Sequence, residues 1–298
     1  MKNQEVLVRA RYINPYTDFG FKKLFGEEAN KDLLIDFLNQ LLPVEHTIVG
    51  LTFKNSEQWG DVRADRRAIF DIHCENERGD TFIVEMQKAK LKFFKDRSLF
   101  YSTFPIKEQA EKGEWDFKLK PVYCVAILDF VFDDDREEKN YISDVQLKDQ
   151  YCRVFYNKLR YIFIEMPRFE KTEDELKTHF EKWLYFLKNL ESFENIPEIL
   201  KENVFIKGFE IAEIANFDKK QLSDYEESLK RYRDLKGVID TSFEEGERTG
   251  REKGREEGRE EGKKERDKEI AKDMKKDGLP IDAILKYTSL TREEIETL

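Results

Sequence analysis

Three side chains that offer oxygen ligands lie close together in the first half of the chain. Asp71 is followed by Glu85, and Gln87 comes two residues later. Side chains alternate between the two faces of a strand, so Glu85 and Gln87 share one face. A hairpin with the preceding segment brings Asp71 alongside them. Two carboxylates and an amide oxygen at one spot are ligands of the kind that Mg²⁺ prefers. The expected chemistry is phosphodiester cleavage, in which a metal activates water and neutralises charge at phosphorus.

The elements that must position these residues are predicted from hydrophobic patterning. Residues 70–87 read F-D-I-H-C-E-N-E-R-G-D-T-F-I-V-E-M-Q, which predicts two strands joined by a polar turn at residues 77–80. On the second strand, Phe82, Val84 and Met86 should face away from Glu85 and Gln87. Apolar residues at three- and four-residue steps predict helices over 15–42 and 93–113, whereas 47–53, 68–74, 81–87 and 122–132 are predicted strands.

The motif residues support a resemblance to a known family. Asp71, followed after a glycine turn by Glu85-x-Gln87, resembles the core of the PD-(D/E)XK nucleases, with Gln87 in place of the usual lysine. The chain as a whole resembles the recombination-promoting nuclease (Rpn) and putative transposase family. The stretches that carry this resemblance are N-P-Y-T-D-F-G-F-K-K-L-F-G (14–26), I-V-E-M-Q (83–87), F-F-K-D-R-S-L-F-Y (93–101), P-V-Y-C-V-A-I-L-D-F (121–130) and Y-I-F-I-E-M-P-R-F (161–169).

The resemblance implies an α/β fold with an αβββαβ nuclease core, to which the predicted element order corresponds. It also implies DNA as the substrate and Mg²⁺ or Mn²⁺ as the cofactor. Asp71 and Glu85 would then hold the metal, and Gln87 would complete the catalytic site. Glutamine carries no charge and can only hydrogen-bond or offer its carbonyl oxygen to the metal. Gln87 therefore leaves open whether the nuclease activity is full, weak or specialised. The alternative is that both carboxylates are ordinary polar residues at a solvent-exposed strand edge.

Basic residues follow the carboxylate strand directly. We expect DNA contacts from a set of residues of this region and of the first helix, namely Lys22, Lys88, Lys90, Lys92, Arg97 and Tyr101. Arg97 and Tyr101 are four residues apart and share a helix face. In the alternative interpretation Arg97 is a surface ion-pair residue and Tyr101 belongs to the core. Lys22 is a candidate for the positive charge that Gln87 lacks.

Composition and charge limit the function classes. The net charge of −10 argues against phosphate binding by the whole chain, but residues 1–130 carry 20 Lys and Arg against 21 Asp and Glu. Whether the first part of the chain binds phosphate therefore depends on the local electrostatic field and not on the total charge. Three cysteines without a C-x-x-C pair indicate reduced, buried or half-buried thiols and a cytoplasmic protein. No apolar run approaches the roughly 20 residues needed to span a membrane.

The rest of the chain is predicted to be mainly helical. We expect a nuclease core over 12–132, a helical extension packed on it over 133–240, a charged helix over 241–278 and a helix-turn-helix-like cap over 279–298. Glycines fall at every fourth position of the charged helix, at 246, 250, 254, 258 and 262. This stripe would allow close helix-to-helix approach in a homo-oligomer, whereas the alternative is a disordered charged linker.

Two functions from different classes remain. The first is a Mg²⁺-dependent DNA endonuclease of low sequence specificity, linked to recombination or mobile elements. The second is a catalytically degenerate nuclease fold that acts as an oligomeric scaffold for DNA or protein. The missing lysine at Gln87 favours the second, whereas the two retained carboxylates favour the first.

Overall fold

The computed structural model describes residues 10–58, 68–110, 116–132 and 140–298. Contacts divide the chain into two compact units, Met1–Lys236 and Gly237–Leu298. Helix α6 (Lys219–Lys276) is continuous across this boundary. Its first residues belong to the first unit, where Tyr225 and Tyr232 are buried in the main core.

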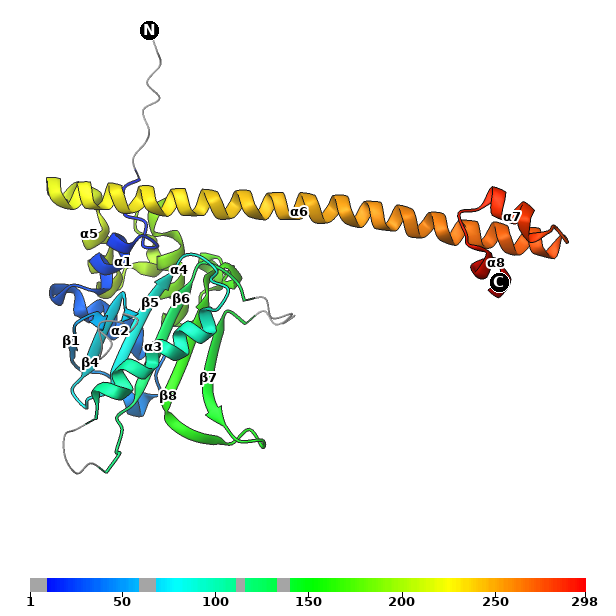
Figure 1. Ribbon diagram of the computed structural model, residues 1–298. Coiled ribbons are helices and arrows are strands. Elements are labelled where there is room, and N and C mark those ends of the chain that lie inside the picture. The colour runs from blue at the N-terminus through cyan, green and yellow to red at the C-terminus, as the bar shows by residue number, and fades with distance from the viewer. Residues whose placement is uncertain (1–9, 59–67, 111–115, 133–139) are drawn as a thin grey trace, which may run out of the picture. The chain divides into compact units, whose positions relative to one another are not determined.

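A six-stranded sheet forms the centre of the first unit (Figure 1). Its strands, in spatial order, are β1 (Leu51–Phe53), β4 (Ile72–Asn76), β5 (Thr81–Gln87), β6 (Val122–Leu128), β8 (Val154–Glu165) and β7 (Ile142–Lys148). β4 and β5 are antiparallel, whereas β5, β6 and β8 run parallel to one another. A separate two-stranded ribbon pairs β2 (Glu57–Gln58) with β3 (Ala68–Ile69).

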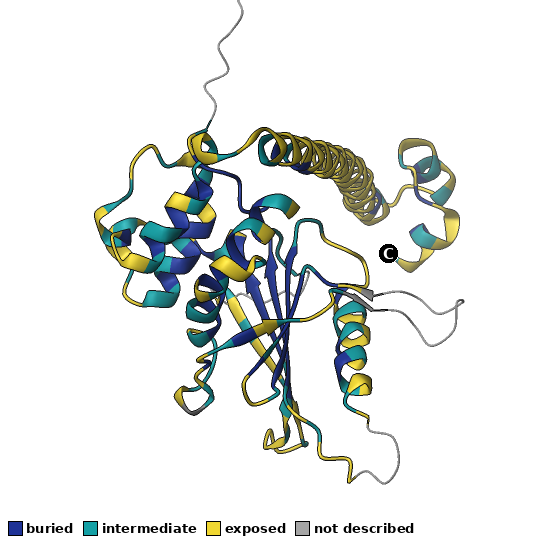
Figure 2. Cartoon of the chain, turned by 90° about the vertical axis from the view of Figure 1, so that its left-hand side faces the viewer, coloured by how far each residue is buried: buried dark blue, intermediate teal, exposed yellow. Residues whose placement is uncertain are grey.

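Helices cover both faces of this sheet, and the buried side chains form two cores (Figure 2). The larger core joins one face to α1 (Asp18–Phe25), α2 (Lys31–Asn39), α4 (His179–Asn189) and α5 (Asn203–Ala212). The smaller core joins the other face to α3 (Phe94–Glu108). Phe82, Val84 and Met86 belong to the larger core and Ile83 to the smaller, so the predicted alternation along β5 is confirmed.

The predicted order of helix, three strands, helix and strand is confirmed, although several bounds differ. The first helical region is two helices, because α1 ends at Gly26 and short 3₁₀ turns at Glu28–Asn30 and Val44–His46 flank α2. The first strand begins only at Leu51. The second is interrupted at Asp71, between β3 and β4. Helix α3 ends at Glu108, before the predicted end at residue 113, which lies outside the described residues.

The region after residue 132 contributes more strand than the sequence predicts. β7 and β8 both lie in the region predicted to be a helical extension. Both extend the same sheet beyond β6, so residue 132 lies between two strands of one sheet. Short 3₁₀ turns at Met166–Arg168, Glu173–Glu175, Leu190–Ser192, Glu198–Leu200 and Ile214–Asn216 link the helices that follow.

The second unit consists of the rest of α6 with α7 (Ile281–Tyr287) and α8 (Arg292–Thr297). Ala271, Ile284, Leu290 and Ile295 form its small core. Thr291 and Glu294 make a capping box at the start of α8. Among the described residues, no helix is both long and apolar enough to cross a membrane.

Candidate active site

The β4–β5 hairpin sets the register of the carboxylates. Gly79 has φ of +81°, a conformation that suits glycine, and the Asp80 amide donates to Asn76 Oδ1 at 2.9 Å. The turn fixes Ile72 opposite Val84. Asp71, one residue before Ile72, therefore lies at the level of Glu85, one residue after Val84. The hairpin that the sequence predicts thus brings the two carboxylates together.

Asp71 lies in the bend before β4 and is held in place by the backbone of β5. The Met86 amide donates to Asp71 Oδ2 at 2.8 Å. Burial raises the pKa of Asp71, and the nearby Asp18 charge raises it further. The Met86 hydrogen bond and the cations Lys22 and Lys88 act in the opposite direction without cancelling the rise. Asp71 is therefore a carboxylate in a position where a cation would stabilise its charge.

Glu85 is the more buried member of the pair, with 8% of its surface exposed. Burial raises its pKa to about 7, and the Asp71 charge adds to this rise, whereas Arg97 opposes it. Glu85 Oε1 is buried and has no hydrogen-bond partner among the residues that the structure describes. A buried charged oxygen without a partner is costly. An ion or a polar ligand beside it would remove that cost.

Gln87 shares the face of Glu85 but is only half-buried. Its amide nitrogen donates to the Ala89 carbonyl at 3.0 Å, within the loop that follows β5. This bond commits the amide nitrogen, so the side-chain oxygen is the atom that Gln87 offers to a ligand.

A cleft of about 470 Å³ opens beside Asp71. Its lining comes from α1, from the β1–β2 region, from β4 and from the start of α6. Four cations line it, namely Lys22, Lys23, Lys54 and Arg231. Of these four, only Lys22 was predicted. Lys23 follows it on α1, whereas Lys54 and Arg231 come from distant segments whose proximity has no local sequence signal.

The other predicted DNA-contact residues lie on two sides of the carboxylate pair. Lys88 donates to Asp18 Oδ1 at 2.5 Å and so joins the end of β5 to α1. Lys90 and Lys92 are exposed in the loop before α3, and the Lys92 ammonium lies 5.4 Å from the centre of the Phe93 ring. This predicted set is therefore not one continuous cluster.

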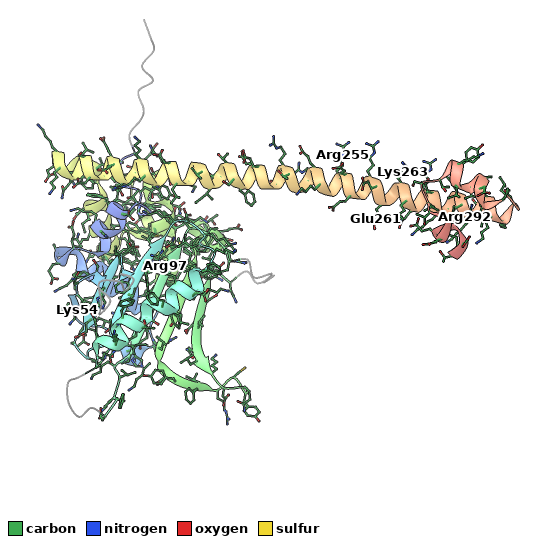
Figure 3. All side chains as sticks on the ribbon, viewed as in Figure 1. Lys54, Arg97, Arg255, Glu261, Lys263 and Arg292 are labelled. Atoms are coloured by element: carbon green, nitrogen blue, oxygen red, sulfur yellow. The ribbon has the colours of Figure 1, made fainter. Side chains whose placement is uncertain are left out.

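Arg97 and Tyr101 share one side of α3, as predicted. The Arg97 guanidinium lies 4.7 Å from the centre of the Tyr101 ring, and Tyr101 in turn contacts Phe70 edge-on at 5.3 Å. Arg97 Nε is buried and meets no hydrogen-bond partner in the described part of the chain. Figure 3 shows Arg97 on α3, in front of the sheet, and Lys54 near β1. Arg97 is thus a cation on the Glu85 side of the pair.

The donor set fits a hard divalent cation. Asp71 and Glu85 are adjacent, and Glu85 Oε1 is buried and unsatisfied. Across the parts of the chain that the structure describes, no group of three or more His, Cys, Asp or Glu forms a metal cage. A two-carboxylate site of this kind suits Mg²⁺, which commonly keeps several waters and takes few protein ligands.

Comparison with known proteins decides the family. The family model described as PD-(D/E)XK nuclease family transposase matches residues 15–242. The chain belongs to this family. The predicted resemblance and the α/β fold of the PD-(D/E)XK nucleases are thereby confirmed. Searches of curated proteins and of solved structures found no match. Nucleases of the PD-(D/E)XK family generally use divalent metal ions.

Proposed function

We propose that this PD-(D/E)XK family member is a Mg²⁺-dependent DNA endonuclease of low sequence specificity, linked to recombination or mobile elements. The observation that carries the proposal is the unsatisfied, buried Glu85 Oε1 beside Asp71. Mn²⁺ is the alternative metal. The free cysteines are consistent with a cytoplasmic location, although Cys152 is exposed and not buried as predicted.

Asp71 and Glu85 would hold the metal, which would supply Lewis acidity and positive charge at the reacting phosphate. The Met86 amide keeps Asp71 directed at the site through its 2.8 Å hydrogen bond. The Gln87 oxygen would accept a hydrogen bond from water or complete the ligand set. The described side chains at the proposed site do not form a motif that reads bases. This supports low sequence specificity.

The proposed DNA contacts are electrostatic. Lys90 and Lys92 would meet the backbone on one side of the carboxylates, and Lys22 on the other. Arg97 would bind a phosphate through its guanidinium, with Tyr101 supporting it by a cation–π contact. Lys88 would contribute mainly through the Asp18 pair that holds α1 near the site.

We further propose that the chain forms a homo-oligomer through the glycine-striped part of α6. Every residue from 233 to 266 is exposed, and a Cβ built on Gly246, Gly250, Gly254, Gly258 or Gly262 meets nothing within 4 Å. A bare stripe of this kind favours close packing against a second helix.

Plasmid nicking by the purified protein tests the enzymatic proposal. We expect nicking with Mg²⁺ or Mn²⁺ that stops with EDTA, and that falls by at least about 10³-fold in Asp71→Ala and in Glu85→Ala. Folding of both variants is checked by circular dichroism. Nicking that survives both substitutions would show that these carboxylates are not the site.

The second candidate function is a non-catalytic scaffold for DNA or protein. It is favoured by Gln87, whose amide nitrogen bonds its own loop where a lysine would carry charge. A folded oligomer that binds DNA but does not cut it with any divalent metal would establish this function and exclude the first.

A further inference from the structure

The cations that line the cleft beside Asp71 differ in one respect. Lys23 pairs with Glu27 at 3.1 Å, Lys54 with Glu75 at 3.2 Å, and Arg231 with Glu227 at 3.1 Å. No hydrogen bond or ion pair engages the Lys22 ammonium within the described part of the chain. Lys22 is therefore the cation of this cleft that forms no ion pair with a described carboxylate, although its charge acts on Asp71 across the cleft.

The backbone beneath Lys22 is rigid. Helix α1 begins at Thr17, whose hydroxyl accepts from the Gly20 amide at 2.9 Å. Phe21, Leu24 and Phe25 are at most 1% exposed in the larger core. Lys22 is on the exposed side of this anchored helix, and it lines the same cleft as Asp71. A charged group on a fixed element needs little reorganisation when charge develops nearby.

The other cations near the carboxylates, Lys88 and Arg97, already contact other side chains. Lys88 is bound to Asp18. Arg97 does not line this cleft, and its guanidinium stacks on Tyr101 next to Glu85. Gln87, at the position of the family's lysine, carries no charge, and its amide nitrogen is held by Ala89.

We infer that Lys22 is a catalytic residue of the proposed nuclease, whose ammonium contacts a non-bridging oxygen of the scissile phosphate and replaces the charge that Gln87 lacks. The inference rests on the proposed function. In the reaction, a water oxygen bonds to phosphorus and the bond from phosphorus to the leaving oxygen breaks. The proton of the water passes to solvent, and solvent protonates the leaving oxygen. The Lys22 ammonium stabilises the extra negative charge on the phosphoryl oxygens.

The test compares Lys22→Gln and Lys22→Arg with Lys54→Gln, which removes a paired cation of the same cleft. Each full-length protein is assayed for single-turnover nicking at saturating protein, for affinity to a short duplex in EDTA, and for Mn²⁺ binding by calorimetry. Circular dichroism melting verifies the fold, which an exposed lysine should not disturb.

We expect Lys22→Gln to lower the single-turnover rate by about 10²–10³-fold, the usual loss for one group that stabilises developing charge. Duplex affinity should change less than about threefold, because one exposed phosphate contact contributes little to ground-state binding. Lys22→Arg should recover part of the rate because it keeps the charge, and Mn²⁺ binding should persist in every variant. Lys54→Gln should retain its rate within about threefold, since exposed ion pairs contribute little.

The outcomes separate this inference from the proposed function. A wild-type protein that nicks DNA while Lys22→Gln nicks at the same rate overturns the role of Lys22 alone. A variant that loses duplex affinity but keeps its saturated rate makes Lys22 a simple phosphate contact, which also overturns it. Loss of Mn²⁺ binding in Lys22→Gln would assign the defect to the metal site. A wild-type protein without any nicking removes both proposals.

Discussion

The β4–β5 hairpin and the glycine-striped part of α6 both carry charged residues, but these residues differ in how far they are buried. Six of the seven residues of β5 are buried, Glu85 among them. Every residue from 233 to 266 in α6 is exposed. In the hairpin, burial raises the pKa of Glu85 to about 7. In the helix, carboxylates and cations face water, as in the Glu247–Arg251 pair at 2.6 Å.

Glutamate therefore takes on two roles in this protein. A glutamate placed in a buried strand is costly to ionise, so it is suited to a bound cation. A glutamate on a solvated helix supports solubility and weak pairing with its neighbours. The hairpin is organised by its own tertiary contacts, whereas the striped helix has no core contacts within its own unit until Asp267 and Ala271.

The largest effect that separates the two regions should appear in the stability of the metal-free protein. The folded-state pKa of Glu85 is about 7, above the 4.5 of the unfolded chain. The stability that this group contributes is therefore fully present below pH 4.5 and is lost as the pH rises through about 7. Glu85→Gln removes this loss and should raise the free energy of unfolding by about 2–3 kcal/mol at pH 8 relative to the wild type.

Urea denaturation at pH 4.5 and pH 8 with EDTA measures this difference. The matched control is Glu252→Gln, the same change on the exposed helix, which should alter stability by no more than about 0.5 kcal/mol. Equal effects of the two substitutions at pH 8 would erase the distinction between the regions.

The second effect concerns metal binding at the hairpin. A metal ligand must be deprotonated, so apparent affinity for Mn²⁺ should rise about tenfold per pH unit below pH 7 and level off above it. Calorimetry between pH 5.5 and pH 8.5 gives this profile, with Asp71→Ala as the variant without binding. A flat profile below pH 7 would mean that Glu85 is not a ligand.

The smallest effect is expected in the striped helix. Alanine at Gly250, Gly254 and Gly258 adds methyl groups to the stripe and should weaken the oligomer, as measured by sedimentation velocity. A lone helix would respond oppositely, because each alanine would stabilise it by about 1 kcal/mol. Alanine at Glu252, Glu256 and Glu260 is the control, since each is rotated about 200° from a glycine. Oligomerisation that survives the glycine substitutions would remove the stripe as the interface.

Local patterns in the sequence predicted the hairpin well. Alternation along β5 and the turn glycine at residue 79 specify strand, face and register without help from distant residues. The charged helix over 241–278 and the short helices over 279–298 were likewise predicted, and the structure contains them. The start of α4 has a less distinct local signal, because two capping boxes follow one another: Thr172 and Glu175 cap a 3₁₀ turn, and Thr178 and Glu181 cap α4 itself.

Sequence alone determined the identity and facing of the carboxylates, since side-chain alternation follows from backbone geometry. The tertiary structure determined which cation beside them forms no ion pair with a described carboxylate. Lys22 and Arg231 come from α1 and α6, and Lys54 follows β1 and pairs with Glu75 of β4, so only folding brings these three cations to one cleft. It also decided that β7 and β8 continue the nuclease sheet, because the exposed, weakly patterned β7 is held as a strand by pairing with β8.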